Sequence, residues 1–94
     1  MFSWDPNKAV SNFEKHRVSF EEATTIFVDP SGLEVDDLRH SLEERRLKRL
    51  GISILGRVLL VVYAARRSID GKETIRIISA RQASRKERAA YARP

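Results

Sequence analysis

The chain has 94 residues, no cysteine and a net charge of +5, which allows one domain with one modest core and excludes a disulfide scaffold and a thiolate metal site. Its start, MFSWDPNK, is too polar and acidic for a signal peptide, and its longest apolar run, residues 58–65, is far shorter than the ~20 residues of a membrane helix. We therefore expect a soluble cytoplasmic protein without a membrane partner.

The N-terminal segment predicts a short strand followed by a helix. Residues 1–4 can form the strand, and Asp5-Pro6 is typical of an N-cap followed by proline at the first helical position. The helix is expected to run to about Lys15, with Val10 and Phe13 at helical spacing.

A second helix is predicted after the first. Ser19 and Glu22 have the spacing of a capping box, and the helix is expected to run to about Phe27. Residues 33–42 are acidic and lack clear periodicity, so they predict a loop. The apolar side chains of the second helix should be buried: Phe20, Ala23, Ile26 and Phe27.

The second half of the chain predicts three strands and a final helix. Residues 44–50 alternate in polarity and carry many charges, which is typical of an edge strand. Residues 57–63 are β-branched and aromatic on both faces, which indicates a central strand. An Asp-Gly pair within residues 68–72 predicts a hairpin loop before a last strand over residues 73–81. A second capping box over residues 84–87 then opens a short basic helix.

The resulting order, β-α-α-β-β-β-α, predicts an α+β domain. Its antiparallel sheet would be covered on one face by the two N-terminal helices, and the first strand could join that sheet. Nothing in the sequence covers the other face completely, so a ligand is expected to lie there.

Charge is divided unevenly along the chain. Residues 1–44 hold four Lys or Arg and ten Asp or Glu, a net of −6, whereas residues 45–94 hold fourteen and three, a net of +11. This asymmetry favours a polyanionic partner for the second half, although a solvated basic surface would look the same. Arginine outnumbers lysine thirteen to five, and guanidinium groups bind phosphate bidentately and stack on bases, which favours nucleic acid.

Several phrases together resemble the BrnT family, the toxins of a type II toxin–antitoxin pair. They are FSWDPNKAVSNFEKHRVSFEEA, EERRLKRLG, GRVLLVVYAAR and IRIISARQASRKERAAY, and they cover residues 2–91. The W-D-x-x-K opening, the K-H-x-V-x-F-E-E-A phrase and the R-I-I-S-A-R ending are specific in combination. The chain departs from the family at Arg17, where glycine is frequent, and at Arg46, where an aromatic residue is frequent.

The resemblance implies a RelE-like fold and a small ribonuclease that cleaves RNA and stops translation without a metal or another cofactor. It also implies a cognate BrnA-like antitoxin that neutralises the toxin in a hetero-oligomer. That complex would bind operator DNA and repress its own operon.

Metal-free RNA cleavage uses the ribose 2′-hydroxyl as nucleophile, and it needs a base, an acid and fixed positive charge at the phosphorane. Arg76 and Arg81 of the last strand are the catalytic candidates for that charge. In a regular strand they would face opposite sides of the sheet. We expect Arg81 near the ligand and Arg76 as a phosphate binder; the alternative for each is a solvated arginine or an ion pair.

Three further residues are catalytic candidates. Glu44, before the basic strand, is the best carboxylate base, and its alternative is a cross-strand ion pair with an arginine. His16 has the pKa range for acid–base work, but a lone histidine is usually structural or capping. Lys8 lies one turn into the first helix, near Trp4, which is expected in the core.

Four residues are candidates for substrate binding. Arg66 ends the central strand and could join the cationic cluster. Arg85 and Arg88 are three residues apart and share a face of the last helix. Tyr91 could stack on a base or donate its hydroxyl group, and its alternative is packing of the helix onto the sheet.

The sequence has no H-x-x-x-H motif, no paired-carboxylate signature and no glycine-rich phosphate loop. The residues themselves therefore support binding of RNA or phosphate, and cleavage follows from the resemblance. The alternative functions are a non-catalytic RNA- or DNA-binding module that uses the basic C-terminal half, and an interaction protein with an acidic partner.

Overall fold

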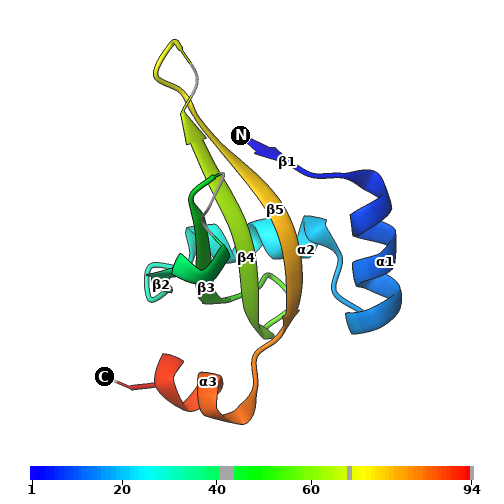
Figure 1. Cartoon of the computed structure of the whole chain (residues 1–94). Coiled ribbons are helices and arrows are strands. Elements are labelled where there is room, and N and C mark those ends of the chain that lie inside the picture. Colours follow the sequence, from blue (N-terminus) through cyan, green and yellow to red (C-terminus); the bar gives the residue numbers. More distant parts are fainter. Residues whose placement is uncertain (41–43, 68, 94) are drawn as a thin grey trace.

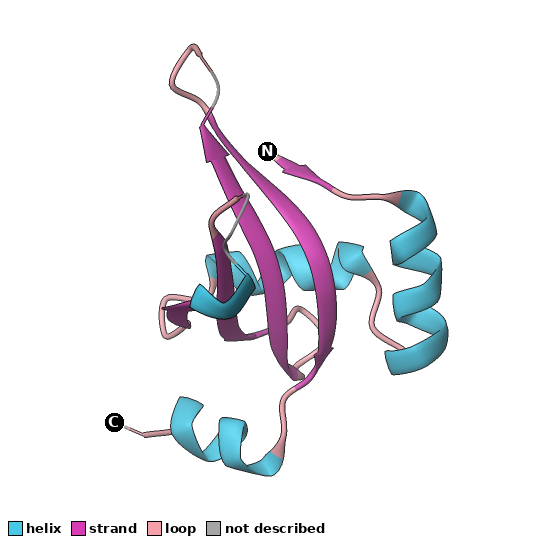
Figure 2. Cartoon of the chain, in the orientation of Figure 1, coloured by secondary structure: helices cyan, strands magenta, loops and turns pink. Residues whose placement is uncertain are grey.

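The chain folds into one five-stranded sheet with helices behind it, beside it and at one end (Figure 1; Figure 2). The computed structural model describes residues 1–40, 44–67 and 69–93. In chain order the elements are β1 (Phe2–Ser3), α1 (Pro6–His16), α2 (Phe20–Thr24), the 3-10 helix η1 (Thr25–Val28), β2 (Leu33–Asp36), the 3-10 helix η2 (Leu38–His40), β3 (Arg46–Ile52), β4 (Val58–Arg67), β5 (Glu73–Gln82) and α3 (Arg85–Tyr91). None of the helices in these ranges has the length and apolar character needed to cross a bilayer.

The order of strands in the sheet is β1-β5-β4-β3-β2. The expected antiparallel meander is present as β3, β4 and β5. The first strand joins the sheet parallel to β5, so the first and last strands of the chain are neighbours.

The loop expected over residues 33–42 was wrong for its first part, because β2 pairs antiparallel with β3. All four residues of β2 are exposed, so the strand has no burial alternation that periodicity could detect. An ion pair of 3.0 Å, Arg49–Glu34, joins the two strands, and a second of 3.0 Å joins Asp36 to Arg45, the residue before β3. The strand over residues 46–52 is therefore internal and not an edge strand. Positions 41 and 42 of the expected loop, and position 68 of the expected hairpin, lie outside the described residues.

The core lies between one face of the sheet and α2 with η1. Phe20, Ala23 and Ile26 are fully buried, as predicted, and they pack against inward-facing residues of β4 and β5. Each large apolar side chain buried in this way contributes roughly 1.5–3 kcal/mol relative to an exposed one. Phe27 is only half-buried, and its ring lies edge-on 4.9 Å from that of Tyr63.

The first helix does not cover the sheet face as expected, but lies beside the outer edge of β5 (Figure 1). Val10 and Phe13 are exposed, and Asn12 is the buried residue of this helix. The Asn12 amide nitrogen donates to the carbonyls of Ala80 at 2.8 Å and Val18 at 3.0 Å, and its oxygen accepts the Ala80 N–H at 3.1 Å. The side chain therefore pairs with the edge of β5 as a neighbouring strand would.

A β-bulge changes which side chains of β5 share a face. Val62 pairs with Ser79 but Tyr63 pairs with Ile77, so Ile78 has no partner on β4. As a result Arg76 lies opposite Ala64 and Arg81 lies opposite Leu60. Ala64 and Leu60 are four residues apart on β4 and point to the same side. Arg76 and Arg81 therefore share the face opposite α2, and the prediction of opposite faces was wrong because the bulge inserts one residue between them.

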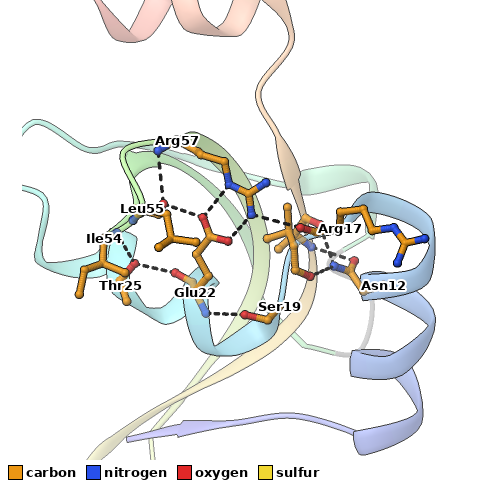
Figure 3. A network of polar contacts seen from close by, with 11 residues as sticks. Asn12, Arg17, Ser19, Glu22, Thr25, Ile54, Leu55 and Arg57 are labelled. Carbon is orange, nitrogen blue, oxygen red and sulfur yellow. Dashed lines mark hydrogen bonds and ion pairs between the residues drawn. The ribbon is translucent and has the colours of Figure 1, made fainter.

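A buried polar network joins α2 to the turn between β3 and β4 (Figure 3). Glu22 accepts hydrogen bonds from both Arg57 Nε, at 3.0 Å, and Arg57 Nη2, and from the Ser53 hydroxyl at 2.7 Å. Burial opposes ionisation, but these hydrogen bonds outweigh it and lower the pKa of Glu22. Ser19 caps α2 as expected by accepting the Glu22 N–H at 3.0 Å, whereas the Glu22 side chain bonds Arg57 and leaves the box incomplete.

Candidate functional site

A cleft of about 730 Å³ lies at the end of the sheet where β4 runs into β5. Among the described residues one carboxylate, Glu44, lines it. Its other charged side chains are cations from α1, β4, β5 and the start of β3: Lys8, Arg45, Arg46, Arg66, Arg67 and Arg76. Such a concentration of positive charge around a hollow attracts anions.

Strand register explains why these arginines converge. Arg46 and Arg76 both lie opposite Ala64, one on each neighbouring strand. Strands are ~4.8 Å apart, so the two backbones are about 10 Å apart and long side chains can reach one point between them. Arg66 lies two residues beyond Ala64 and therefore points to the same face. The small, fully buried Ala64 leaves this space to the guanidinium groups.

Glu44 forms an ion pair with Arg66 inside the cleft. Its Oε2 lies 2.5 Å from Arg66 Nη2 and 3.0 Å from Nε. The hydrogen bond from Arg66, with the positive charges of Arg46 and Arg76, lowers the pKa of Glu44 although burial opposes this. The structure thus shows the ion pair with an arginine that was one of the two interpretations of Glu44. A carboxylate held in this way is a weak proton acceptor.

Two cleft cations, Lys8 and Arg76, have unused donors. Within the described part of the chain neither side chain forms a hydrogen bond or ion pair. Arg76 is half-buried on β5, whereas Lys8 is exposed on the first turn of α1. Both are positioned to contact an anion without first breaking a protein contact.

His16 lies in a second hollow of about 350 Å³ between α1 and β5. Lys8 and Ile78 line both this hollow and the cleft, so the two are adjacent. A third hollow, of about 340 Å³, adjoins the cleft on the other side and is lined by Trp4 and the cleft residues Arg66 and Arg76. Trp4 also packs on the core, with its ring 5.9 Å from that of Phe20.

Arg81 does not line the cleft. Its two terminal nitrogens lie 2.8 and 3.0 Å from the two carboxylate oxygens of Glu87. Glu87 also completes the capping box predicted with Ser84. The structure therefore places Arg81 in an ion pair at the junction of β5 and α3, the alternative that the sequence left open.

The substrate-binding candidates on α3 also lie outside the cleft lining. Arg85 is exposed, and Arg88 Nη1 donates to the Ala83 carbonyl at 2.9 Å. The Tyr91 hydroxyl donates to Asp29, a buried carboxylate that also accepts the Ile52 N–H at 2.8 Å. Burial alone would raise the pKa of Asp29, but these hydrogen bonds lower it. The Tyr91 hydroxyl therefore joins α3 to the residue that follows η1, and a role of Tyr91 in substrate binding stays a prediction.

Sequence reasoning thus named four cleft residues separately, Lys8, Glu44, Arg66 and Arg76, and the fold brings them together. It missed Arg45, Arg46 and Arg67. The basic character of residues 45–49 was visible, but only the strand register places Arg46 beside Ala64 and opposite Arg76.

The arginine-lined cleft of this small α+β domain has the charge expected of a site that binds a polyanion. A sequence model of the family "Ribonuclease toxin, BrnT, of type II toxin-antitoxin system" matches residues 4–87, so the chain belongs to the BrnT family. The crystal structure of the Brucella abortus ribonuclease toxin BrnT is 20% identical and superposes with a TM-score of 0.62, covering 90% of this chain and 99% of that one. No curated protein matches the chain. Membership of this toxin family implies an RNA substrate and an antitoxin partner.

Proposed function

We propose that this protein is a metal-independent endoribonuclease toxin of RelE-like fold that cleaves RNA in the cleft and thereby inhibits translation. The observation that carries the proposal is the convergence of Arg46, Arg66 and Arg76 around Ala64, with Lys8 approaching from α1. Fixed cations on rigid strands can bind the RNA phosphate and stabilise the charge that develops on the phosphorane.

Arg76 is assigned the central role because it is half-buried, points into the cleft and has no hydrogen bond or ion pair among the described residues. Its guanidinium can bind two phosphate oxygens at once. Arg66 contributes a second cation. A bound phosphate would accept hydrogen bonds from Arg66 in addition to Glu44 or in its place.

Proton transfer is assigned to Lys8, which lines both the cleft and the second hollow, and to His16, which lines the second hollow. The 2′-hydroxyl must lose a proton and the 5′-oxygen must gain one. Glu44 is less suited to this work because its ion pair with Arg66 lowers its pKa. RNA would be a substrate and DNA would not, because DNA lacks the nucleophile.

The partner is proposed to be a BrnA-like antitoxin in the cytoplasm. An inhibitor of the cleft must present negative charge to the cations that line it. The toxin and antitoxin would form a hetero-oligomer that binds operator DNA, as the family resemblance implies.

The test is incubation of the purified protein with RNA in EDTA, beside Arg76→Ala and a control variant, Lys86→Ala. Lys86 is exposed on α3 and does not line the cleft. We expect wild type and Lys86→Ala to give fragments ending in 2′,3′-cyclic phosphate, and Arg76→Ala to cleave 10²- to 10³-fold more slowly, the typical loss of one charge-stabilising donor. Its melting temperature should remain that of wild type.

Three outcomes would count against the proposal. RNA that is retarded on a gel but never shortened, with or without translating ribosomes, would favour the non-catalytic nucleic-acid-binding module. Cleavage abolished by EDTA and restored by a divalent ion would overturn metal independence. Undiminished cleavage by folded Arg76→Ala would remove Arg76 from the site.

A further inference from the structure

The cleft continues as a groove between α1 and β5. The hollow beyond Lys8 and Ile78 is lined by Ser11, Lys15 and His16 on the helix side, and by residues of β5 on the other. Its volume of about 350 Å³ is at the small end of ligand pockets. A groove of this size, bounded by a helix and a strand edge, can admit one nucleotide of a single strand but not a duplex.

The helix face that lines this groove is regularly spaced. Lys8, Asn12 and Lys15 lie at positions i, i+4 and i+7, so they form one stripe along α1. Seven residues of helix place Lys15 about 10.5 Å beyond Lys8. Within the described residues the Lys15 side chain forms no hydrogen bond or ion pair. The stripe therefore offers a second cation at a fixed distance from the cleft.

Asn12 fixes the direction of that stripe. Its three hydrogen bonds to Ala80 and Val18 hold α1 against the edge of β5, with Lys8 and Lys15 on either side. The bulge completes the path, because Ile78 has no partner on β4 and lines both hollows where they meet. The cleft and the groove are thus parts of one continuous rigid surface.

We propose that Lys15 forms a second backbone subsite, at which the RNA strand leaving the cleft places its next phosphate. The substrate is then single-stranded RNA that runs along α1, and its path avoids α3. This inference rests on the proposed function, since it extends the same RNA-binding site.

The test measures binding of random-sequence 2′-O-methyl RNA probes of two to eight nucleotides, which the enzyme cannot cleave. The proteins compared are wild type, Lys15→Gln and the control Lys86→Gln. Wild-type affinity should rise with probe length until the strand reaches Lys15. The Lys15→Gln variant should bind the shortest probes as wild type does, but lose the gain at greater length. Its salt dependence on the longer probes should fall by about 0.7 in slope, the value for one phosphate contact on a single strand. Lys86→Gln should match wild type at every length.

The outcomes separate the two proposals. If wild type binds and cleaves RNA but Lys15→Gln follows the wild-type length dependence, the second subsite is wrong and the proposed function stands. If Lys86→Gln loses the gain instead, the strand runs over α3. If wild type binds none of the probes and leaves RNA intact, both proposals fail.

Discussion

Arg81 and Glu87 form a bidentate ion pair that joins the end of β5 to the first turn of α3, with nitrogen–oxygen distances of 2.8 and 3.0 Å. The same Glu87 carboxylate accepts the Ser84 N–H at 2.8 Å. One side chain thus caps the helix and anchors it to the sheet. Arg81 is therefore predicted to be more important for stability than for catalysis.

Replacing Glu87 by Gln should lower the free energy of unfolding by roughly 0.5–1 kcal/mol at pH 7, through loss of the ion pair, because glutamine can still accept the Ser84 N–H. The hydrogen bond from Arg81 lowers the pKa of Glu87 from 4.5 to about 2. The ionised form is thus favoured by folding, and its contribution is present above pH 4.5 and is lost as the pH falls towards 2. Urea unfolding at pH 7 and pH 3 should show the gap between wild type and variant shrinking in acid. An unchanged gap would contradict this assignment.

The ion pair of Glu44 with Arg66 raises the question whether Glu44 positions Arg66 or acts as a general base. If Glu44 positions Arg66, Glu44→Gln keeps a hydrogen-bond acceptor and removes a negative charge, so kcat should change less than tenfold and KM should fall. A general base would instead lose 10²- to 10⁴-fold in kcat. Steady-state cleavage of a short RNA measures both quantities, and a large loss of kcat at constant KM would return Glu44 to the role of base.

Glu22 and Arg57 are expected to be important for stability alone. Removing the carboxylate leaves Arg57 half-buried without its partner and Ser53 without an acceptor. Glu22→Ala should therefore lose about 2–4 kcal/mol of unfolding free energy. The matched control is Glu21→Ala, an exposed neighbour in the same helix, which should stay within about 0.5 kcal/mol of wild type. Equal losses in chemical denaturation would show that the network contributes nothing specific.

Arg17 ends α1 in the left-handed conformation, with φ 58° and ψ 32°. Glycine adopts this conformation without strain, which gives a physical reason for a glycine at this position. Arg17→Gly should raise the free energy of unfolding by about 0.5 kcal/mol, the relief of strain being partly offset by loss of the contact with the Phe13 ring 5.8 Å away. Arg17→Ala keeps the strain and loses the contact, so it should be no more stable than wild type. A thermal melt of the two variants distinguishes these effects.

Sequence patterns predicted a helix correctly where its apolar spacing or its capping residues lie within the helix itself. The apolar spacing of Phe20, Ala23 and Ile26 located α2, and the Ser84–Glu87 box located α3. The strand β2 was missed because it is exposed on both faces and is held by its pairing with β3. The position of α1 was missed because it depends on a buried amide, Asn12, and not on an apolar stripe.

The candidate site shows the same limit. Lys8, Arg66 and Arg76 could each be named from the sequence by residue type, but their meeting depends on pairings between distant segments. The bulge at Ile78 places Arg76 and Arg81 on the same face of the sheet, and no local sequence pattern predicts this bulge. Ion pairing then separates them further, because Arg81 bonds Glu87 while Arg76 has no such partner in the described part of the chain.

The parallel pairing of β1 with β5 joins two segments more than 70 residues apart in one sheet. Lys8 lies on α1 and Arg76 on β5, so the cleft cannot assemble before β5 has been synthesised. Such distant contacts also make folding slow and cooperative. A fragment of residues 1–72 is therefore expected to be unfolded by circular dichroism and inactive on RNA; a folded fragment would contradict this. Translation that stops before β5 would then release only an inactive fragment.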